Sequence, residues 1–160
     1  MEEMGAKKED YFAGEELTFD ELEIGMEFPP TTYELTEKTI AKYIEVIGDK
    51  NLLYMDEEEA EKSGFEGVIA PATILSLYTK PSNILSGLRP KKRPPSGSIH
   101  AAQKYEFIKE IRPGDTITSV SKVVDKYLKK GRKYLHIETC CYNKKEEKVA
   151  VGEATAIWGK

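Results

Sequence analysis

Apolar positions recur with a helical period in the first half of this chain. Four apolar residues fall at i, i+3, i+4 and i+7, the spacing of one helix face: Ile40, Tyr43, Ile44 and Ile47. Thr36 is a residue type that caps helix N-termini, and Gly48 is the type that most often follows a helix C-terminus. The pattern predicts a helix between these two residues, followed by a polar loop over Asp49–Met55.

A second, shorter helical region has a different character. Asp56 is expected to cap a short acidic turn that Gly64 ends. Pro71 then stands at a first-turn position before Ala72–Tyr78, a segment in which nearly every residue is apolar or small. A segment that is apolar on all sides predicts a buried helix, over about residues 71–80, rather than an amphipathic surface helix.

The last third of the chain has the composition of β-strands. Four runs are predicted to be strands: Ile99–Ile108, Thr116–Lys126, Lys133–Tyr142 and Val149–Trp158. Glu27–Leu35 is a further strand candidate, and its two prolines confine it to a sheet edge. Several antiparallel strands after one buried helix predict an α+β fold in which the sheet wraps around that helix. We expect the other face of the sheet to need cover, supplied by a second subunit's sheet.

The remaining segments are expected to be irregular. Residues 1–10 are charged and predict a flexible tail, so that residues 11–160 form one domain. Residues 11–26 predict a loop or short turn, and residues 86–98, rich in Pro, Gly and Lys/Arg, predict a long irregular loop.

Composition narrows the classes of function. A net charge of −4 gives no overall basic footprint for nucleic acid. No apolar run approaches the roughly 20 residues of a membrane span, and the charged N-terminus does not resemble a signal peptide. Cys140 and Cys141 are adjacent, so on a strand one thiol is expected inside and one near the surface. No Cys/His spacing predicts a metal site, and the composition favours a reducing cytoplasm.

Three segments, in order, resemble the MaoC-like dehydratases, which have the hotdog fold. The family motif Gly-Asp-x-Asn-Pro-Leu-His stands here as Gly48-Asp49-Lys50-Asn51-Leu52-Leu53-Tyr54. The second match is GFEGVIAPATIL, Gly64–Leu75. The third is His100–Phe107 with Ile111–Thr116, which is similar to the subfamily named for the N-terminal half of MaoC dehydratase. The resemblance covers about residues 15–158 and implies a hotdog fold that pairs into a double hotdog.

The resemblance implies water addition to, or elimination from, acyl thioesters of the 2-enoyl-CoA and 3-hydroxyacyl-CoA kind, as in fatty acid metabolism. Asp49 matches the catalytic Asp and Asn51 the motif Asn, while Tyr54 stands where the family has His. The backbone N–H groups of Ala72 and Thr73, at the start of the central helix, are expected to meet the thioester oxygen. No cofactor or metal is implied beyond the CoA or acyl-carrier-protein thioester itself.

Tyr54 leaves the activity of the chain open. Tyrosine has a reference pKa of about 10, so at pH 7 roughly one side chain in a thousand is ionised. A positioned general base contributes about 10²–10⁴ in rate. The resemblance to heteromeric (3R)-hydroxyacyl dehydratases implies a catalytic MaoC-like partner. A homodimer is the other assembly, and a non-catalytic acyl-CoA-binding or assembly subunit is the alternative function.

A hotdog thioesterase is a less favoured function, and the two histidines and one basic loop complete the list of candidate residues. A hotdog thioesterase needs a carboxylate on or near the central helix, and PATILSLYTK contains none. His100 and His136, the two histidines of the chain, are each expected to be structural. The basic loop from Arg89 to Arg93 either is solvated or meets CoA phosphates.

Overall fold

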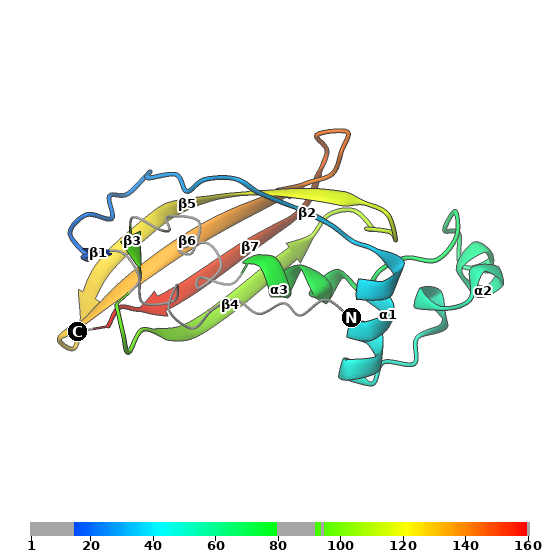
Figure 1. Cartoon of the computed structure of the whole chain (residues 1–160), viewed down its shortest axis with the longest axis horizontal. Helices are drawn as coiled ribbons and strands as arrows, with labels where there is room; N and C mark the ends of the chain where they lie inside the picture. Colours follow the sequence, from blue (N-terminus) through cyan, green and yellow to red (C-terminus); the bar gives the residue numbers. More distant parts are fainter. Residues whose placement is uncertain (1–14, 80–91, 94, 160) are drawn as a thin grey trace.

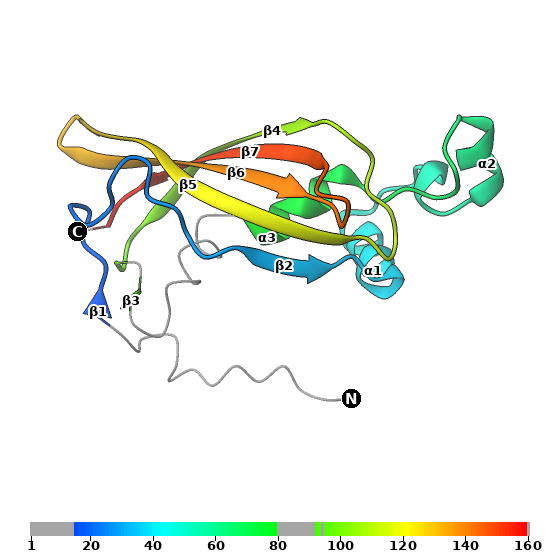
Figure 2. The same cartoon turned by 90° about the horizontal axis from the view of Figure 1, so that it is seen from above.

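A five-stranded antiparallel sheet organises the part of the chain that the computed structural model describes, residues 15–79, 92–93 and 95–159. Its strands lie side by side in the order β2-β5-β6-β7-β4. Their bounds are β2 (Thr31–Glu34), β5 (Thr116–Lys129), β6 (Arg132–Tyr142), β7 (Lys148–Ile157) and β4 (Ile99–Phe107). The four predicted C-terminal strands are therefore confirmed. Figures 1 and 2 show the sheet with the helices α1 and α3 on one of its faces.

Alternation of side chains sets the inner face of the sheet. Along β6, every second residue from Leu135 to Cys141 is buried, and the residues between them are half-buried. The β5–β6 hairpin turns at Lys130 and Gly131, whose φ angles of 50° and 71° suit the tight turns that match strand twist. Cys141 lies inside and Cys140 on the other face, as the strand period predicts.

The outer face of the sheet is partly charged. It carries charged pairs across the strands, Lys122–Glu138 and Lys104–Glu153, each with 3.1 Å between nitrogen and oxygen. Charged pairs of this kind are compatible with contact with water. Cover of this face by a second subunit's sheet stays a prediction. Within the described residues, the sheet has two edge strands: the short β2, bonded only to β5, and the longer β4, bonded only to β7. Pairing into a double hotdog stays a prediction.

The helix α1 (Glu37–Ile47) forms where the apolar spacing predicts it. The Thr36 side chain accepts a hydrogen bond from the Thr39 N–H at 3.2 Å, and Gly48 ends the helix in the left-handed conformation at φ 66°. Ile40 and Ile44 are buried, whereas Ile47 is 45 % exposed because it lies at the end of the stripe. The acidic turn is α2 (Glu57–Lys62), capped by the Asp56 carboxylate at 3.0 Å from the Glu59 nitrogen.

The central helical segment begins as a 3₁₀ turn. Ala72–Leu75 is the 3₁₀ turn, and α3 (Ser76–Thr79) continues it. Ile74 and Leu75 are fully buried against strand residues such as Ile117 and Ala150, so the segment packs on the sheet as predicted. Leu77 is 41 % exposed, so the segment is not buried on all sides, which corrects that part of the prediction. The predicted end of this helix at residue 80 lies outside the described residues.

The leading segment differs most from expectation. The predicted loop over residues 11–26 is more than a simple connection where it is described, because three of its apolar residues are buried: Leu17, Phe19 and Leu22. Together with Phe28 they form a second core cluster with Val123, Leu135, Ile137 and Trp158. The Lys126 ammonium donates to the carbonyl oxygens of Phe19 and Leu22 at 2.9 and 2.6 Å. These apolar positions follow no helix or strand period, so long-range packing alone places them.

Two short elements lie in segments predicted to be irregular. β1 (Glu15–Glu16) pairs in parallel with β3 (Lys92–Arg93), so residues 86–98 are not wholly irregular where they are described. β2 begins at Thr31 rather than at residue 27, after the two prolines, and is an edge strand as predicted. The predicted tail over residues 1–10 lies outside the described residues. The division of the chain into this tail and one domain over residues 11–160 stays a prediction.

Candidate active site

The loop after α1 is built by its own side chains. The Asp49 carboxylate accepts a hydrogen bond from the Asn51 N–H at 2.9 Å, and the Asn51 side-chain oxygen accepts one from the Leu53 N–H at 3.1 Å. Asn51 thereby caps the 3₁₀ turn Leu52–Tyr54. These bonds use one Asp49 oxygen, Oδ1. The other, Oδ2, has no hydrogen-bond partner among the described residues and is available to a ligand or water.

A pocket of about 770 Å³ lies beside this loop, and we call it the α1 pocket. Ile40 and Ile44 of α1 contribute apolar surface to it, and both Asp49 and Tyr54 line it. Tyr54 is half-buried and packs against the main core cluster. The fold thus brings together two of the predicted site residues, one that can bind water through a carboxylate and one that can donate from a phenol.

The other predicted site residues lie outside this pocket. Asn51 is exposed and shapes the loop instead of lining the α1 pocket. Ala72 is half-buried and Thr73 is exposed in the first turn of the central helical segment, and neither lines the α1 pocket. The first N–H groups of a helix have no partner within it, so both residues keep the donors that the oxyanion role requires.

Tyr43 connects the two parts of the candidate site. Its phenol donates a hydrogen bond to the Thr73 hydroxyl at 3.1 Å, which ties α1 to the start of the central helical segment. The sequence offered two hints of this role: Tyr43 belongs to the apolar stripe of α1, and it precedes the Gly48–Tyr54 motif. Neither hint identifies its partner, because Thr73 is 30 residues away in the chain.

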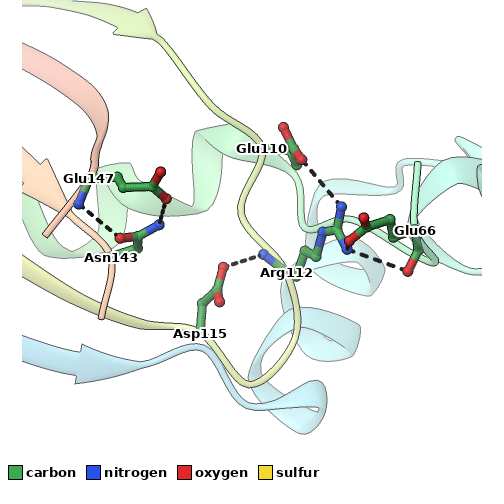
Figure 3. A network of polar contacts seen from close by, with 6 residues as sticks. All are labelled: Glu66, Glu110, Arg112, Asp115, Asn143 and Glu147. Atoms are coloured by element: carbon green, nitrogen blue, oxygen red, sulfur yellow. Dashed lines mark hydrogen bonds and ion pairs between the residues drawn. The ribbon is translucent and has the colours of Figure 1, made fainter. Parts of the chain in front are cut away.

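Arg112 is a second residue of the candidate site that no sequence motif identifies. It lines the α1 pocket, and its guanidinium lies 3.2 Å from carboxylate oxygens of both Glu66 and Glu110 (Figure 3). Its backbone N–H donates to the Asp115 carboxylate at 2.8 Å, which closes the turn before β5. The segment Ile111–Thr116 carried the resemblance, but spacing alone does not show that its arginine faces the pocket.

Figure 3 also shows a neighbouring contact in the β6–β7 turn, where the Asn143 side chain donates to the Glu147 carboxylate at 2.9 Å. The Asn143 side-chain oxygen also accepts from the Glu147 N–H at 3.0 Å, so the amide closes this turn on both sides. Lys109 lies 2.6 Å from the same carboxylate. These bonds lower the pKa of Glu147, the contact with Lys109 being the main cause.

The charges around the α1 pocket are mainly negative. Its lining includes five acidic residues, Glu37, Glu45, Asp49, Glu57 and Glu66, but only two cations, Lys50 and Arg112. Arg112 is already paired with Glu66 and Glu110. A phosphate group near this rim therefore gains no net attraction from the described part of a single chain.

Neither histidine belongs to the candidate site. His100 hydrogen-bonds the Ala102 carbonyl on β4 at 3.1 Å, and His136 lies 3.3 Å from the Tyr127 hydroxyl on the outer face. The residues lining the α1 pocket include no histidine, so no Asp/His pair exists there.

Within residues 15–79, 92–93 and 95–159, no group of three or more His, Cys, Asp or Glu side chains could hold a metal ion. No helix among them is long and apolar enough to span a membrane.

Known proteins resemble the chain over most of its length. Residues 23–151 match the family described as FAS1-like, dehydratase domain region. A UPF0336 protein of Streptomyces avermitilis is 30 % identical over 109 residues, covering 67 % of this chain and 73 % of that protein. The mitochondrial 3-hydroxyacyl-[acyl-carrier-protein] dehydratase of Arabidopsis thaliana is 28 % identical over 127 residues, 79 % of this chain and 72 % of that protein.

Solved structures share the fold. The (R)-hydratase of A. caviae involved in PHA biosynthesis has a TM-score of 0.68 at 23 % identity, covering 86 % of this chain and 98 % of that one. The HadBC (3R-hydroxyacyl-ACP dehydratase) complex of Mycobacterium tuberculosis has a chain with a TM-score of 0.72 at 18 % identity, covering 84 % of this chain and 96 % of that one. At these identities the likeness establishes the hotdog fold.

Proposed function

Since this chain belongs to the FAS1-like dehydratase family of MaoC-like hotdog proteins, we propose that it is a subunit of a hydratase-dehydratase acting on acyl thioesters. The observation that carries the proposal is that Asp49 and Tyr54, five residues apart in the loop after α1, line the same pocket. Asp49 and Tyr54 stand at the family's Asp and His positions, so the pocket corresponds to the place where water would be held.

The proposed chemistry is reversible addition of water to a 2-enoyl thioester. The Asp49 carboxylate accepts a proton from water as the water oxygen bonds to the β-carbon, and the protonated Asp49 then gives this proton to the α-carbon, which restores the carboxylate. The product is a 3-hydroxyacyl thioester. Negative charge that develops on the thioester oxygen meets the N–H groups of Ala72 and Thr73. Tyr54 donates a hydrogen bond to water or thioester oxygen, but a neutral phenol does not replace the imidazole as a base.

We propose that a catalytic MaoC-like partner completes the enzyme. Three observations support a partner: Tyr54 in the histidine position, the acidic rim of the α1 pocket, and the free edge of β4. The HadBC and ChsH1–ChsH2 structures show that proteins of this fold form complexes of two different chains. A homodimer formed through the same edge is the other assembly that the free strand permits.

The test is reconstitution. The chain is purified alone and together with a second family member, from the same genome, that has an intact Asp/His motif. Hydration of short-, medium- and long-chain 2-enoyl-CoA, and of the same acyl groups on acyl-carrier protein, is then measured. We expect rapid hydration by the complex and slow or no hydration by the chain alone. Absence of hydration by any combination would overturn the proposal. The comparison of the two carriers also shows which thioester the enzyme uses in the cytoplasm, where we place it.

A non-catalytic acyl-CoA-binding or assembly subunit is the second candidate, and Tyr54 is the observation that favours it. In that case an Asp49→Asn variant of this chain leaves the activity of the complex unchanged, whereas catalysis by this chain makes the same variant inactive. Thioester hydrolysis is the third and weakest candidate, because the segment Pro71–Thr79 carries no carboxylate. Acyl-CoA hydrolysis by the isolated protein would instead make thioester hydrolysis the leading candidate function.

A further inference from the structure

A row of small and polar residues crosses the inner face of the sheet. Four residues lie opposite one another on β5, β6, β7 and β4, and we call them the polar row: Ser121, Thr139, Gly152 and Tyr105. Ser121 and Thr139 are buried and share a hydrogen bond of 2.8 Å. The buried apolar residues form two separate clusters, and none of the polar row belongs to either of them.

Two threonine hydroxyl groups of the central helical segment form hydrogen bonds, one with Tyr43 of α1 and one with Tyr105 of the polar row. Thr73, which accepts from Tyr43, and Thr79 lie on the same helical segment. Thr79 is 1 % exposed, and its hydroxyl is 2.6 Å from that of Tyr105. Burial raises the pKa of Tyr105, as expected for a phenol that lies against the inner face of the sheet. The flank of the central helix toward β4 is therefore polar.

Gln103 lies on the same polar flank, and its side-chain amide lacks hydrogen-bond partners within the described part of the chain. It lies two residues before Tyr105 on the inner side of β4, opposite Ala154. A Cβ on Gly152 would lie 3.5 Å from the Gln103 side-chain nitrogen, so the amide packs beside the polar row. Both its Nε2 and its Oε1 are shielded from solvent and have no hydrogen-bond partner among the described residues. A buried amide without partners is costly, and native proteins retain one where a ligand or an ordered water completes it.

We propose that Gln103 is a specificity-determining residue that binds a hydroxyl group on the acyl chain of the substrate. This inference rests on the proposed function. A hydroxyl suits the site because one oxygen can donate to the Gln103 carbonyl oxygen and accept from its NH₂ group. A plain hydrocarbon chain on this flank leaves the amide unpaired and also faces the hydroxyls of Thr79 and Tyr105. The substrate class is therefore acyl thioesters that carry a hydroxyl beyond the reacting carbons.

Matched ligands test this specificity by calorimetry on the full chain. The pairs are saturated CoA thioesters of equal length: butyryl and 4-hydroxybutyryl, hexanoyl and 6-hydroxyhexanoyl, octanoyl and 8-hydroxyoctanoyl. We expect the hydroxylated member of at least one pair to bind about tenfold or more tightly. Gln103→Leu should remove that preference and also raise the melting temperature, because it deletes an unpaired buried amide. The control Lys104→Gln changes the next side chain, on the outer face, and should preserve the preference.

The possible results separate the two proposals. Binding of all pairs without preference for the hydroxyl would overturn the role of Gln103, as expected if water completes the amide, and leaves the proposed function standing. A preference that survives Gln103→Leu, or Gln103→Met should the leucine variant not fold, also overturns it. Failure of every thioester to bind, with the same acyl groups tried on CoA and on acyl-carrier protein, contradicts the proposed function and this inference together.

Discussion

At the scale of single residues, the proposed site has a carboxylate, Asp49, and a phenol, Tyr54, where the resemblance to the family implies a carboxylate and an imidazole. Asp49 holds the loop through Oδ1 and keeps Oδ2 available, so a structural and a chemical role coexist in one side chain. Tyr54, where the resemblance implies a histidine, packs against the main core cluster, which holds its ring in place.

The two cysteines should differ in reactivity. Burial raises the pKa of the Cys141 thiol, which lies 3.5 Å from the Ser119 hydroxyl, so its thiolate is scarce at pH 8. Cys140 is on the outer face. We expect a thiol reagent to modify one cysteine in the native protein and two in denaturant, with mass spectrometry identifying Cys140 as the first. Cys140→Ser should remove the native reaction, and equal rates at both thiols would contradict the burial.

Glu21 should make the free energy of unfolding fall at low pH. A hydrogen bond from Lys92, with further bonds from Thr18, lowers the pKa of Glu21 from 4.5 to about 2. Its contribution is present above about pH 4.5 and is lost as pH falls toward 2, since protonation breaks the pair. The midpoint of urea unfolding, measured from pH 6 to 2, should fall less steeply for Glu21→Gln than for wild type. Parallel curves would show that the pair contributes nothing, an outcome that exposed pairs often give.

At the scale of elements, capping by Thr36 is the clearest local determinant. Thr36→Ala removes the acceptor for the Thr39 N–H and should cost about 1 kcal/mol in the free energy of unfolding. Thr36→Ser keeps the hydroxyl and serves as the matched control. Urea titration of the three proteins measures the difference, and equal stability of the alanine and serine variants would show that the cap is unimportant.

Sequence predicted the elements whose signals are local. The caps and apolar stripe of α1, the alternation in β6 and the turn residues between strands each lie within a few positions of one another. The leading segment could not be predicted, because Leu17 and Phe19 are held by residues more than a hundred positions away. The same limit applies to the site: the motif located Asp49 and Tyr54, whereas Tyr43 and Arg112 gain their roles through Thr73 and Glu66, which only the fold brings near.

At the scale of the whole molecule, the free edge of β4 is where a second chain is expected. Large apolar residues are exposed along and just beyond this strand, with Ile99 at 52 %, Phe107 at 43 % and Ile108 at 45 %. An unpaired edge with such residues is a template for pairing with another strand. The resulting interface would also place two candidate sites in one assembly.

Charges placed on that edge should prevent the assembly. We expect light scattering to report more than the 18.1 kDa of one chain for the wild type or its complex. Ile99→Asp combined with Ile108→Asp should reduce it to the separate chains. Val46→Asp is the control, because Val46 is 74 % exposed on α1, away from the edge. Loss of assembly in the control, or its survival in the double variant, would place the interface elsewhere.

The central claim is that this chain has a dehydratase site in which Tyr54 replaces the best base. The most direct test is the initial rate of hydration of a trans-2-enoyl-CoA by the wild-type chain and by Tyr54→His, each without a partner. We expect the rate to rise by about 10² or more in the histidine variant, and the gain to be lost when Asp49→Asn is added. An unchanged rate in Tyr54→His, or a wild-type chain that is already as fast alone, would contradict it.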